Sequence, residues 1–321
     1  MRAFAVRGFG EPASVQDLPV PAADDAVLAR VRFAGVNPLD NNLLGRLNAD
    51  SSYPFVVGID FAGVVERVPA GDHGLRVGDR VFGMARTHGS YAEYTAVAPG
   101  VKTEPLARIP DGVSDEQAAA LPIAAITALG SLELLRVTVG QHLVVMGATG
   151  GVGGYAVQMA RSRGAHVIAT VRGDTAEARQ LGAEEAYDAR ACNVLAALHA
   201  AHPEGVDAVL DLVNGSDAIG HDAEILKSGG SLVSTIHAAD EKWFAERHIT
   251  AHNVASNAVE STPAMTANPS SSPQALTEIV DMLAAGTITA RIRSTAALDG
   301  AAQMLEKLRD GGLRGKAVIR I

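Results

Sequence analysis

The sequence predicts an α/β protein with two domains, one rich in β-strands and one built on a doubly wound parallel sheet. Three observations predict this fold class. The chain has 321 residues, which is longer than one hydrophobic core usually supports. Up to residue 121, short apolar or alternating runs are separated by Gly and Pro, as in a compact, mostly antiparallel β domain. After residue 140, strand-like and helix-like segments alternate, which indicates parallel strands joined by helices.

The β-rich domain begins with a series of short strands. They are expected at residues 2–7, 26–34, 61–68, 80–83 and 91–97. A turn at Pro110 then precedes a helix, for which Ser114 is the expected N-cap and Gln117 completes a capping box.

The parallel sheet follows, with strands expected at residues 143–146, 166–171, 185–187, 208–212, 231–234 and 249–255. The stretch 261–273, rich in Ser, Thr, Pro and Asn, is expected to lead out of this domain. Helices around 275–283 and 298–308 and a last strand at 316–321 are expected to return to the first domain. The predicted domains are therefore 1–121 plus 270–321, and 122–269.

Composition excludes several classes of protein. With 27 Lys and Arg against 36 Asp and Glu, the formal charge is −9, so binding to nucleic acid through its phosphates is disfavoured. The single cysteine, Cys192, excludes an intrachain disulfide and a cysteine-rich zinc site. The first twenty residues lack the apolar core of a signal peptide, and the least charged stretch, 118–132, is too short to span a bilayer. We therefore expect a cytoplasmic protein that binds neither nucleic acid nor membrane.

The segment 143–161 is the most informative part of the chain, because a buried strand, a glycine-rich turn and a helix follow one another directly. The glycines leave room where the chain turns and where a pyrophosphate must approach the backbone. The helix after them offers free N–H groups and the positive end of its dipole. This context predicts a dinucleotide site formed by Gly147, Ala148, Thr149, Gly150, Gly151, Val152 and Gly153.

Further short motifs run the length of the chain. They are 35–40 (GVNPLD), 58–63 (GIDFAG), 77–83 (VGDRVFG), 89–94 (GSYAEY), the turn at 147–154, 226–233 (LKSGGSLV) and 314–318 (RGKAV). Together they resemble the medium-chain dehydrogenase/reductase superfamily, most closely its zinc-free quinone oxidoreductase (zeta-crystallin-like) branch. The resemblance implies a GroES-like catalytic domain, a Rossmann domain, hydride transfer from a nicotinamide cofactor and a homodimer.

Two positions bear on zinc. The zinc-bearing relatives place a Cys where this chain has Asn37 and a His where it has Ile59, and their four-cysteine lobe has no counterpart here. Without those thiolates and that imidazole a tetrahedral site cannot be assembled. We therefore expect no metal.

The end of the second parallel strand bears on the choice of nicotinamide. NAD-binding folds usually place an acidic residue there, but this chain has Val171 followed by Arg172. A guanidinium is suited to a bidentate contact with the 2′-phosphate, which favours NADPH. Two alternatives remain open: Arg172 is only a solvated loop cation, or Asp174 binds a ribose because the strand ends later.

The resemblance also assigns residues to the cofactor site. Asn37 is expected near the nicotinamide ribose or the acceptor, and Thr127 near the cofactor phosphates or the nicotinamide. Residues Ser234, Thr235 and Ile236 are expected along the other edge of the cofactor, and Lys316 of the C-terminal motif joins the same site. Asn37 can instead be a turn residue before Pro38, and Thr127 can instead satisfy a helix carbonyl.

A proton donor is optional for a quinone but valuable for an enoyl thioester. Asp40, Tyr53 and His88 are candidate donors, and Asp40 can instead be a structural carboxylate.

The first interpretation is an NADPH-dependent reductase of quinones or other electron-poor alkenes and carbonyls. The alternatives are an enoyl or enone reductase of a biosynthetic pathway and a non-catalytic NADPH-binding protein, in which the Trp243–Phe244 segment would block the nicotinamide face. The resemblance implies a dimer in which strand 249–255 pairs across a two-fold axis.

Overall fold

The computed structural model describes residues 1–22, 24–71, 74–98, 100–101, 103–236, 239–254 and 271–321. The chain divides into two compact units, residues 1–126 with 271–321, and residues 127–270. Most of the predicted link 261–273, and the end of the predicted strand 249–255, lie outside the described residues. No helix in the described ranges is both long and apolar enough to cross a membrane.

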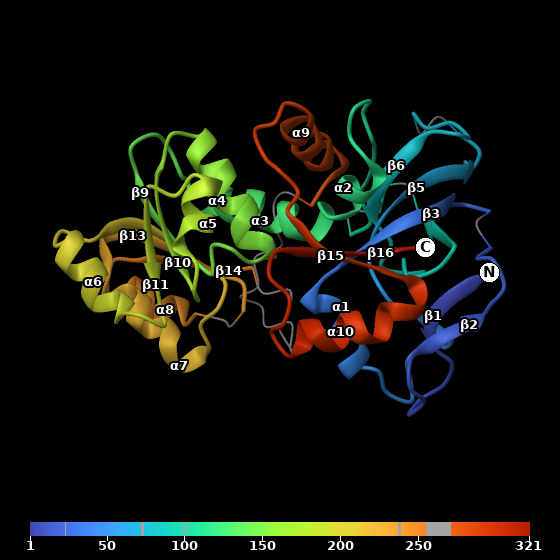
Figure 1. Cartoon of the computed structure of the whole chain (residues 1–321), viewed down its shortest axis with the longest axis horizontal. Coiled ribbons are helices and arrows are strands. Elements are labelled where there is room, and N and C mark those ends of the chain that lie inside the picture. The colour runs from blue at the N-terminus through green and yellow to red at the C-terminus, as the bar shows by residue number, and fades with distance from the viewer. Residues whose placement is uncertain (23, 72–73, 99, 102, 237–238, 255–270) are drawn as a thin grey trace. The chain divides into compact units, whose positions relative to one another are not determined.

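The first unit is built on two β-sheets (Figure 1). The larger has the strand order β15-β16-β3-β5-β6-β8, with β7 paired to β3, and the smaller has the order β2-β1-β4. Every pairing is antiparallel except that of β15 with β16, which confirms the predicted β-rich domain. The strands are β1 (Arg2–Val6), β2 (Ser14–Asp17), β3 (Val27–Val36), β4 (Phe55–Val56), β5 (Asp60–Arg67), β6 (Arg80–Met84), β7 (Tyr94–Val97), β8 (Leu106–Arg108), β15 (Ile292–Ala297) and β16 (Lys316–Arg320).

The C-terminal strand returns to this unit, as predicted, and Ala317 of β16 pairs with Val36 of β3. Its helices are α1 (Pro38–Gly45), α2 (Asp115–Ala119), α9 (Pro273–Ala284), the short 3-10 turn η2 (Leu298–Gly300) and α10 (Ala301–Arg309), and α3 (Pro122–Leu134) contains the boundary between the units. The predicted capping box is confirmed at α2. Ser114 Oγ accepts from the Gln117 N–H at 3.1 Å, and the Gln117 side chain accepts from the Ser114 N–H at 3.1 Å.

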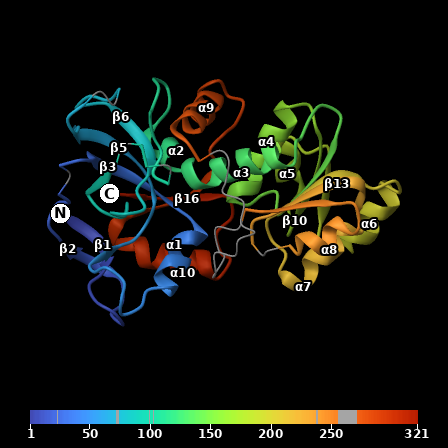
Figure 2. The same cartoon turned by 180° about the vertical axis from the view of Figure 1, so that it is seen from behind.

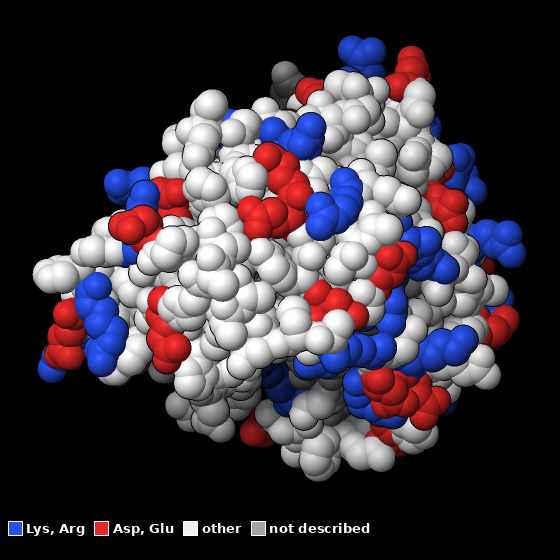
Figure 3. Space-filling model, turned by 60° about the vertical axis from the view of Figure 1, so that its left-hand side comes forward, with Lys and Arg blue, Asp and Glu red and all other residues white. Residues whose placement is uncertain are grey.

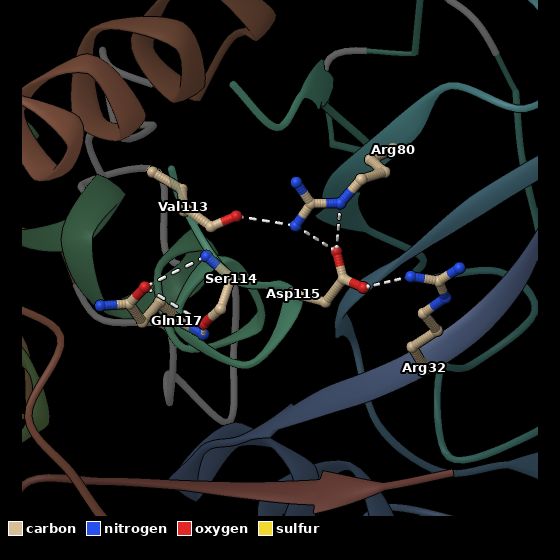
Figure 4. Close-up of polar contacts among 6 residues, drawn as sticks. All are labelled: Arg32, Arg80, Val113, Ser114, Asp115 and Gln117. Carbon is tan, nitrogen blue, oxygen red and sulfur yellow. Dashed lines mark hydrogen bonds and ion pairs between the residues drawn. The ribbon is translucent and has the colours of Figure 1, made fainter. Parts of the chain in front are cut away.

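An ion-pair network holds the start of α2 against the sheet (Figure 4). Asp115 accepts hydrogen bonds from Arg80 of β6 at 2.7 and 2.9 Å and from Arg32 of β3 at 2.8 Å. Arg80 also donates to the Val113 carbonyl at 2.7 Å. Because Asp115 is nearly buried and its partners lie on two strands, the network fixes where the helix leaves the sheet.

The second unit is a parallel six-stranded sheet with the order β11-β10-β9-β12-β13-β14 and helices on both faces (Figures 1 and 2). The strands are β9 (His142–Met146), β10 (His166–Val171), β11 (Glu185–Asp188), β12 (Val206–Asp211), β13 (Leu226–Ser234) and β14 (Thr250–Asn253). The helices are α4 (Gly151–Ser162), α5 (Thr175–Leu181), α6 (Val194–Ala201), α7 (Ser216–Ile219), the 3-10 turn η1 (Gly220–Ala223) and α8 (Glu241–Ala245).

This strand order confirms the predicted doubly wound Rossmann sheet. From β9 the chain winds outward through β10 to β11 and then crosses back to β12 on the other side of β9. The connections leaving β9 and β12 therefore run in opposite directions. In such folds the crevice at the carboxyl ends of these two strands is where ligands bind.

Candidate functional site

The predicted glycine-rich turn connects β9 to α4 in the second unit. Gly147 has a φ of +81°, which favours glycine, and a Cβ on Gly153 would press on the Gly147 carbonyl oxygen and lie 2.9 Å from the Ala148 Cα. The N-cap of α4 is Gly150, which provides no side-chain cap, so the first N–H groups of this 12-residue helix stay available. Backbone donors, a positive helix end and no side chains in the way fit the pyrophosphate of a dinucleotide.

The carboxyl end of β12 lies beside this turn. Asp211 Oδ1 accepts from the backbone N–H groups of Val213 and Asn214, both at 3.0 Å. Asn214 Nδ2 in turn lies 3.2 Å from the sulfur of Met146, the last residue of β9, and donates to Asp222 Oδ1 at 3.1 Å. Burial and the neighbouring Asp211 charge raise the pKa of Asp222 to about 8. The Asp222 carboxyl group therefore keeps its proton at neutral pH for most of the time.

Two of the predicted cofactor residues, Ser234 and Thr235, lie beside the carboxyl end of β12. Thr235 donates its N–H to the Asp211 carbonyl at 3.1 Å, and Ser234 ends β13 with a fully buried hydroxyl. Ile236 follows and is half-buried. Thr127 lies half-buried on α3.

The strand that precedes Arg172 ends where the sequence predicted. β10 stops at Val171, and the exposed Arg172 forms no hydrogen bond or ion pair with the described residues. Asp174 is used locally, since it caps α5 by accepting from the Ala176 N–H at 2.8 Å. A second exposed arginine, Arg190, follows β11. Its backbone lies near the end of β10, since Asp188 Oδ1 accepts from the N–H groups of both Gly173 and Arg190, at 2.8 and 2.9 Å.

In the first unit, Asn37 and Lys316 are in direct contact. Lys316 Nζ donates to Asn37 Oδ1 at 2.6 Å and to the Val36 carbonyl at 3.1 Å. Asn37 Nδ2 donates to Asp60 Oδ2 at 2.8 Å. The exposed fractions of Asn37, Asp60 and Lys316 are only 2%, 0% and 4%.

Asp40 extends this group of buried polar residues. Its Oδ2 accepts from the Asn37 N–H at 2.8 Å and from the Tyr91 hydroxyl at 2.9 Å. The first of these bonds belongs to a capping box at the start of α1. We refer to Asn37, Asp40, Asp60, Tyr91 and Lys316 as the Asn37 cluster.

Burial shifts the acid–base properties of the Asn37 cluster. It raises the pKa of Asp40 to about 7 and that of Asp60 to about 6. It also lowers the pKa of Lys316, although the charges of Asp60 and Asp40 partly restore it. The cluster thus holds an ammonium against two carboxyl groups in a place with little water.

Sequence reasoning did not single out Asp60 and Tyr91 as site residues. Both lie in motifs that it did use, 58–63 and 89–94. A usable signal was present, because Asp60 follows Ile59 and begins a strand whose next five residues, 61–65, carry no polar side chain. A buried carboxylate in such a strand needs partners. The proposed donor Tyr53 instead gives its hydroxyl to the Asn48 carbonyl at 2.9 Å, and within the described ranges no hydrogen bond joins Tyr53 or His88 to the cluster.

By the resemblance, Asn37 and Ile59 stand where zinc-bearing relatives have a Cys and a His, and here the Asn37 oxygen accepts a hydrogen bond from the Lys316 ammonium. A metal ion on that oxygen would lie beside this positive charge. In the part of the chain that the structure describes, no three His, Cys, Asp or Glu side chains converge in a way that could hold a metal ion.

Comparison with known proteins gives consistent matches. Residues 23–111 match the alcohol dehydrogenase GroES-like domain, and residues 181–319 match a domain described as zinc-binding dehydrogenase. A quinone oxidoreductase of Rattus norvegicus is 32% identical over 242 residues, which are 73% of this chain and 72% of that protein. A 2-methylene-furan-3-one reductase of Solanum lycopersicum is 35% identical over 65% of this chain and 54% of its own length. The structure of a quinone oxidoreductase from Coxiella burnetii superposes with a TM-score of 0.84 at 27% identity and covers 100% of this chain and 99% of its own.

Proposed function

The chain belongs to the quinone oxidoreductase branch of the medium-chain dehydrogenase/reductase superfamily, and from this premise we propose that it reduces quinones or other electron-poor alkenes and carbonyls with NADPH and without zinc. Its relatives support the broader assignment as an NAD(P)-dependent oxidoreductase. The observation that carries the proposal is the glycine-rich turn after β9 beside Arg172, which follows the adjacent strand β10 and pairs with none of the described residues. This combination suits a dinucleotide with an extra phosphate.

In this proposal the chain's own residues bind and orient NADPH. The first turn of α4 binds the pyrophosphate through backbone N–H groups, and Arg172 binds the 2′-phosphate. Arg190, whose N–H shares the Asp188 Oδ1 acceptor with the Gly173 N–H, is a second candidate for that phosphate. Thr127, Ser234, Thr235 and Ile236 line the remainder of the cofactor site. NADPH, when bound, supplies the hydride, so the protein needs no nucleophile of its own.

The Asn37 cluster lies in the first unit. From the family resemblance we assign Asn37 and Lys316 to binding of the nicotinamide ribose or of the acceptor. Asp40 supports the cluster, since it caps α1 and is fully buried. Tyr53, which is partly exposed, remains the candidate proton donor.

A second candidate function is an enone reductase. The tomato relative, named for reduction of 2-methylene-furan-3-one, is the observation that favours it. Such a substrate differs from a quinone in needing a proton at carbon after hydride addition, which gives Tyr53 a role.

The proposal also covers partners and location. We propose a cytoplasmic homodimer in which β14, the outermost strand of its sheet, pairs with its symmetry mate. Acidic and basic side chains are intermixed over the face seen in Figure 3, and the net charge is −9. Neither property suits binding to the phosphates of nucleic acid.

Steady-state kinetics with a panel of acceptors tests this proposal. The purified protein should oxidise NADPH much faster than NADH with 1,4-benzoquinone, and a chelator should not change the rate. Faster turnover with a 2-methylene-furan-3-one than with the quinone would favour the enone reductase. Tight NADPH binding with no turnover of any acceptor would favour the non-catalytic alternative and contradict both.

A further inference from the structure

The loops that follow β10 and β11 each carry an exposed arginine. Arg172 comes directly after Val171, the last residue of β10. Arg190 comes two residues after Asp188, the last residue of β11. The two strands are neighbours in the sheet, and Val171 pairs with Asp188 in their register. Because neighbouring strands lie about 4.8 Å apart, the two loops leave the carboxyl edge of the sheet side by side, in the unit that contains the glycine-rich turn.

One carboxylate oxygen holds these two loops together. Asp188 Oδ1 accepts from the Gly173 N–H at 2.8 Å and from the Arg190 N–H at 2.9 Å. A carboxylate oxygen has two lone pairs and can accept both bonds at once. Gly173 has a φ of +119°, which favours glycine, so the chain turns there directly after Arg172. We refer to the two hydrogen bonds on Asp188 Oδ1 as the Asp188 clamp.

Further backbone hydrogen bonds restrain the loop after β11. The Ala189 N–H donates to the Val171 carbonyl at 2.9 Å, which extends the pairing of the two strands by one residue. The Asp188 carbonyl accepts from the Ala191 and Cys192 N–H groups at 2.9 and 3.1 Å. The backbone around the clamp therefore has little freedom, so the clamp fixes where each arginine side chain begins.

The fold itself makes little use of the two guanidinium groups. Arg172 and Arg190 are exposed, and neither side chain forms a hydrogen bond or an ion pair with the residues that the structure describes. The N–H groups of Arg190 and Gly173, and then the positive charge of Arg190, lower the pKa of Asp188. Asp188 is therefore an ionised acceptor at neutral pH, and its Oδ1 is committed to backbone donors.

Two adjacent guanidinium groups match a phosphate monoester. Such a group carries a charge of about −1.5 to −2 at neutral pH and three acceptor oxygens. One guanidinium binds two of these oxygens and balances one charge, so a second guanidinium completes the match. A ribose hydroxyl at the same place carries no charge and gains little from either arginine.

Resting on the proposed function, we propose that Asp188 is a positioning residue for cofactor choice. The Asp188 clamp holds the loops after β10 and β11 so that Arg172 and Arg190 together bind the 2′-phosphate of NADPH. The clamp acts through its acceptor oxygen and not through its charge. It differs in this from the acid of NAD-binding folds, which ends the second strand and accepts from the ribose hydroxyls.

Calorimetric titration with two nucleotides tests the clamp without any turnover. Adenosine 2′,5′-bisphosphate and 5′-AMP differ only in the 2′-phosphate, so the ratio of their Kd values measures the preference for that group. The wild type should prefer the bisphosphate by about 100-fold. Asp188→Ala should lower this preference by about tenfold and leave the Kd of 5′-AMP within about twofold, because it disturbs only the phosphate contacts. Asp188→Asn keeps an acceptor oxygen and should retain at least about a third of the wild-type preference.

A matched control separates the clamp from a general loss of charge or of a hydrogen bond. Asp207 lies in the same unit at the opposite end of the sheet, near the start of β12, and accepts from the His142 N–H at 2.9 Å. Asp207→Ala should leave the preference for the 2′-phosphate unchanged. An equal loss in Asp207→Ala and Asp188→Ala would overturn the proposal, as would weaker binding of both nucleotides to the same degree in Asp188→Ala.

The arginines supply a second test that leaves the clamp intact. Arg172→Ala and Arg190→Ala should each lower the preference by about tenfold. In the protein with both substitutions, adding Asp188→Ala should change the preference by less than about twofold, because no guanidinium is left to position. A further tenfold loss in that background would show that Asp188 acts in another way. An unchanged preference in Arg190→Ala would overturn the proposal even if Asp188→Ala fails to fold.

The outcomes distinguish this proposal from the proposed function. A wild type without preference for the bisphosphate would refute the selectivity for NADPH, and the role of Asp188 with it. A wild-type preference that Asp188→Ala fully retains would refute the clamp alone and leave the proposed function standing. Amide hydrogen exchange gives the structural readout: the N–H groups of Gly173 and Arg190 should exchange slowly in the wild type and in Asp188→Asn and rapidly in Asp188→Ala.

Discussion

Replacing Asp222 with Asn should make the second unit more stable, and increasingly so as the pH rises. Asp222 is 1% exposed, and its burial together with the negative charge of Asp211 raises its pKa from the usual 3.8 to about 8. The native state therefore keeps a proton that the unfolded chain releases, and stability falls as the pH rises from about 4 to about 8. Each pH unit in that range costs about 1.4 kcal/mol, so the interval from pH 6 to pH 8 costs about 2 to 3 kcal/mol. The amide introduced by Asp222→Asn keeps an oxygen for Asn214 and offers an N–H to Asp211 without this penalty.

Urea unfolding at pH 6 and pH 8 measures the effect. The single tryptophan, Trp243, lies on α8 in the same unit as Asp222, so its fluorescence reports unfolding of that unit. The stability advantage of Asp222→Asn over the wild type should grow by about 2 kcal/mol between the two pH values. Asp25→Asn, at an exposed aspartate, should show no such growth. An advantage that stays constant within about 0.5 kcal/mol would refute the raised pKa of Asp222.

Three further predictions follow from the structure. Arg172→Ala should raise the KM for NADPH by about 10- to 100-fold and leave the KM for NADH nearly unchanged, because only NADPH carries the 2′-phosphate; an equal loss with both cofactors in steady-state assays would contradict that contact. Gly153→Ala should weaken NADPH binding, measured by fluorescence titration, by at least about tenfold, because its Cβ would meet backbone at Gly147 and Ala148; Gly45→Ala, with open space around it, is the control and should bind normally. Burial raises the pKa of Glu185, but hydrogen bonds from His166, Tyr187 and His202 outweigh it and lower that pKa below its usual 4.5. The stability that Glu185→Gln loses at pH 7, measured by thermal melts, should therefore vanish as the pH falls through the lowered pKa. A stability difference that does not depend on pH would exclude the contribution of this carboxylate.

Local patterns in the sequence were sufficient for much of the fold. The glycine-rich turn after Met146 could be predicted because conformation, periodicity and spacing all agree within about twenty residues. The capping box of Ser114 and Gln117 could be predicted because its partners are three residues apart. The returning strand β16 lies where its apolar run indicated.

Short or polar strands were harder to predict. β2 is Ser-Val-Gln-Asp and partly exposed, and β4 has two residues. β15 alternates half-buried and exposed positions in a run of Arg, Ser, Thr and Ala. Such segments are strands because a neighbouring strand pairs with them, and tertiary pairing leaves little trace in local composition.

The Asn37 cluster shows the same limit for the site. Asn37 and Lys316 are 279 residues apart in sequence and Asn37 and Asp60 are 23 apart, yet both pairs are in hydrogen-bond contact. No periodicity connects them. The strand order β16-β3-β5 creates the contact. Because the sequence alone does not show that order, it could assign Asn37 and Lys316 to the same site but could not show that they touch each other.

A single-turnover experiment tests the central claim, hydride transfer from NADPH, most directly. The protein is loaded with NADPH or with NADPH carrying deuterium at the transferred position of C4, mixed with 1,4-benzoquinone in a stopped-flow instrument, and followed at the absorbance of the reduced nicotinamide. The account predicts an exponential loss of absorbance that is slower with deuterium and smaller in amplitude with Gly153→Ala, which binds NADPH more weakly. A bound, stable NADPH whose absorbance does not change when the quinone is added would contradict it.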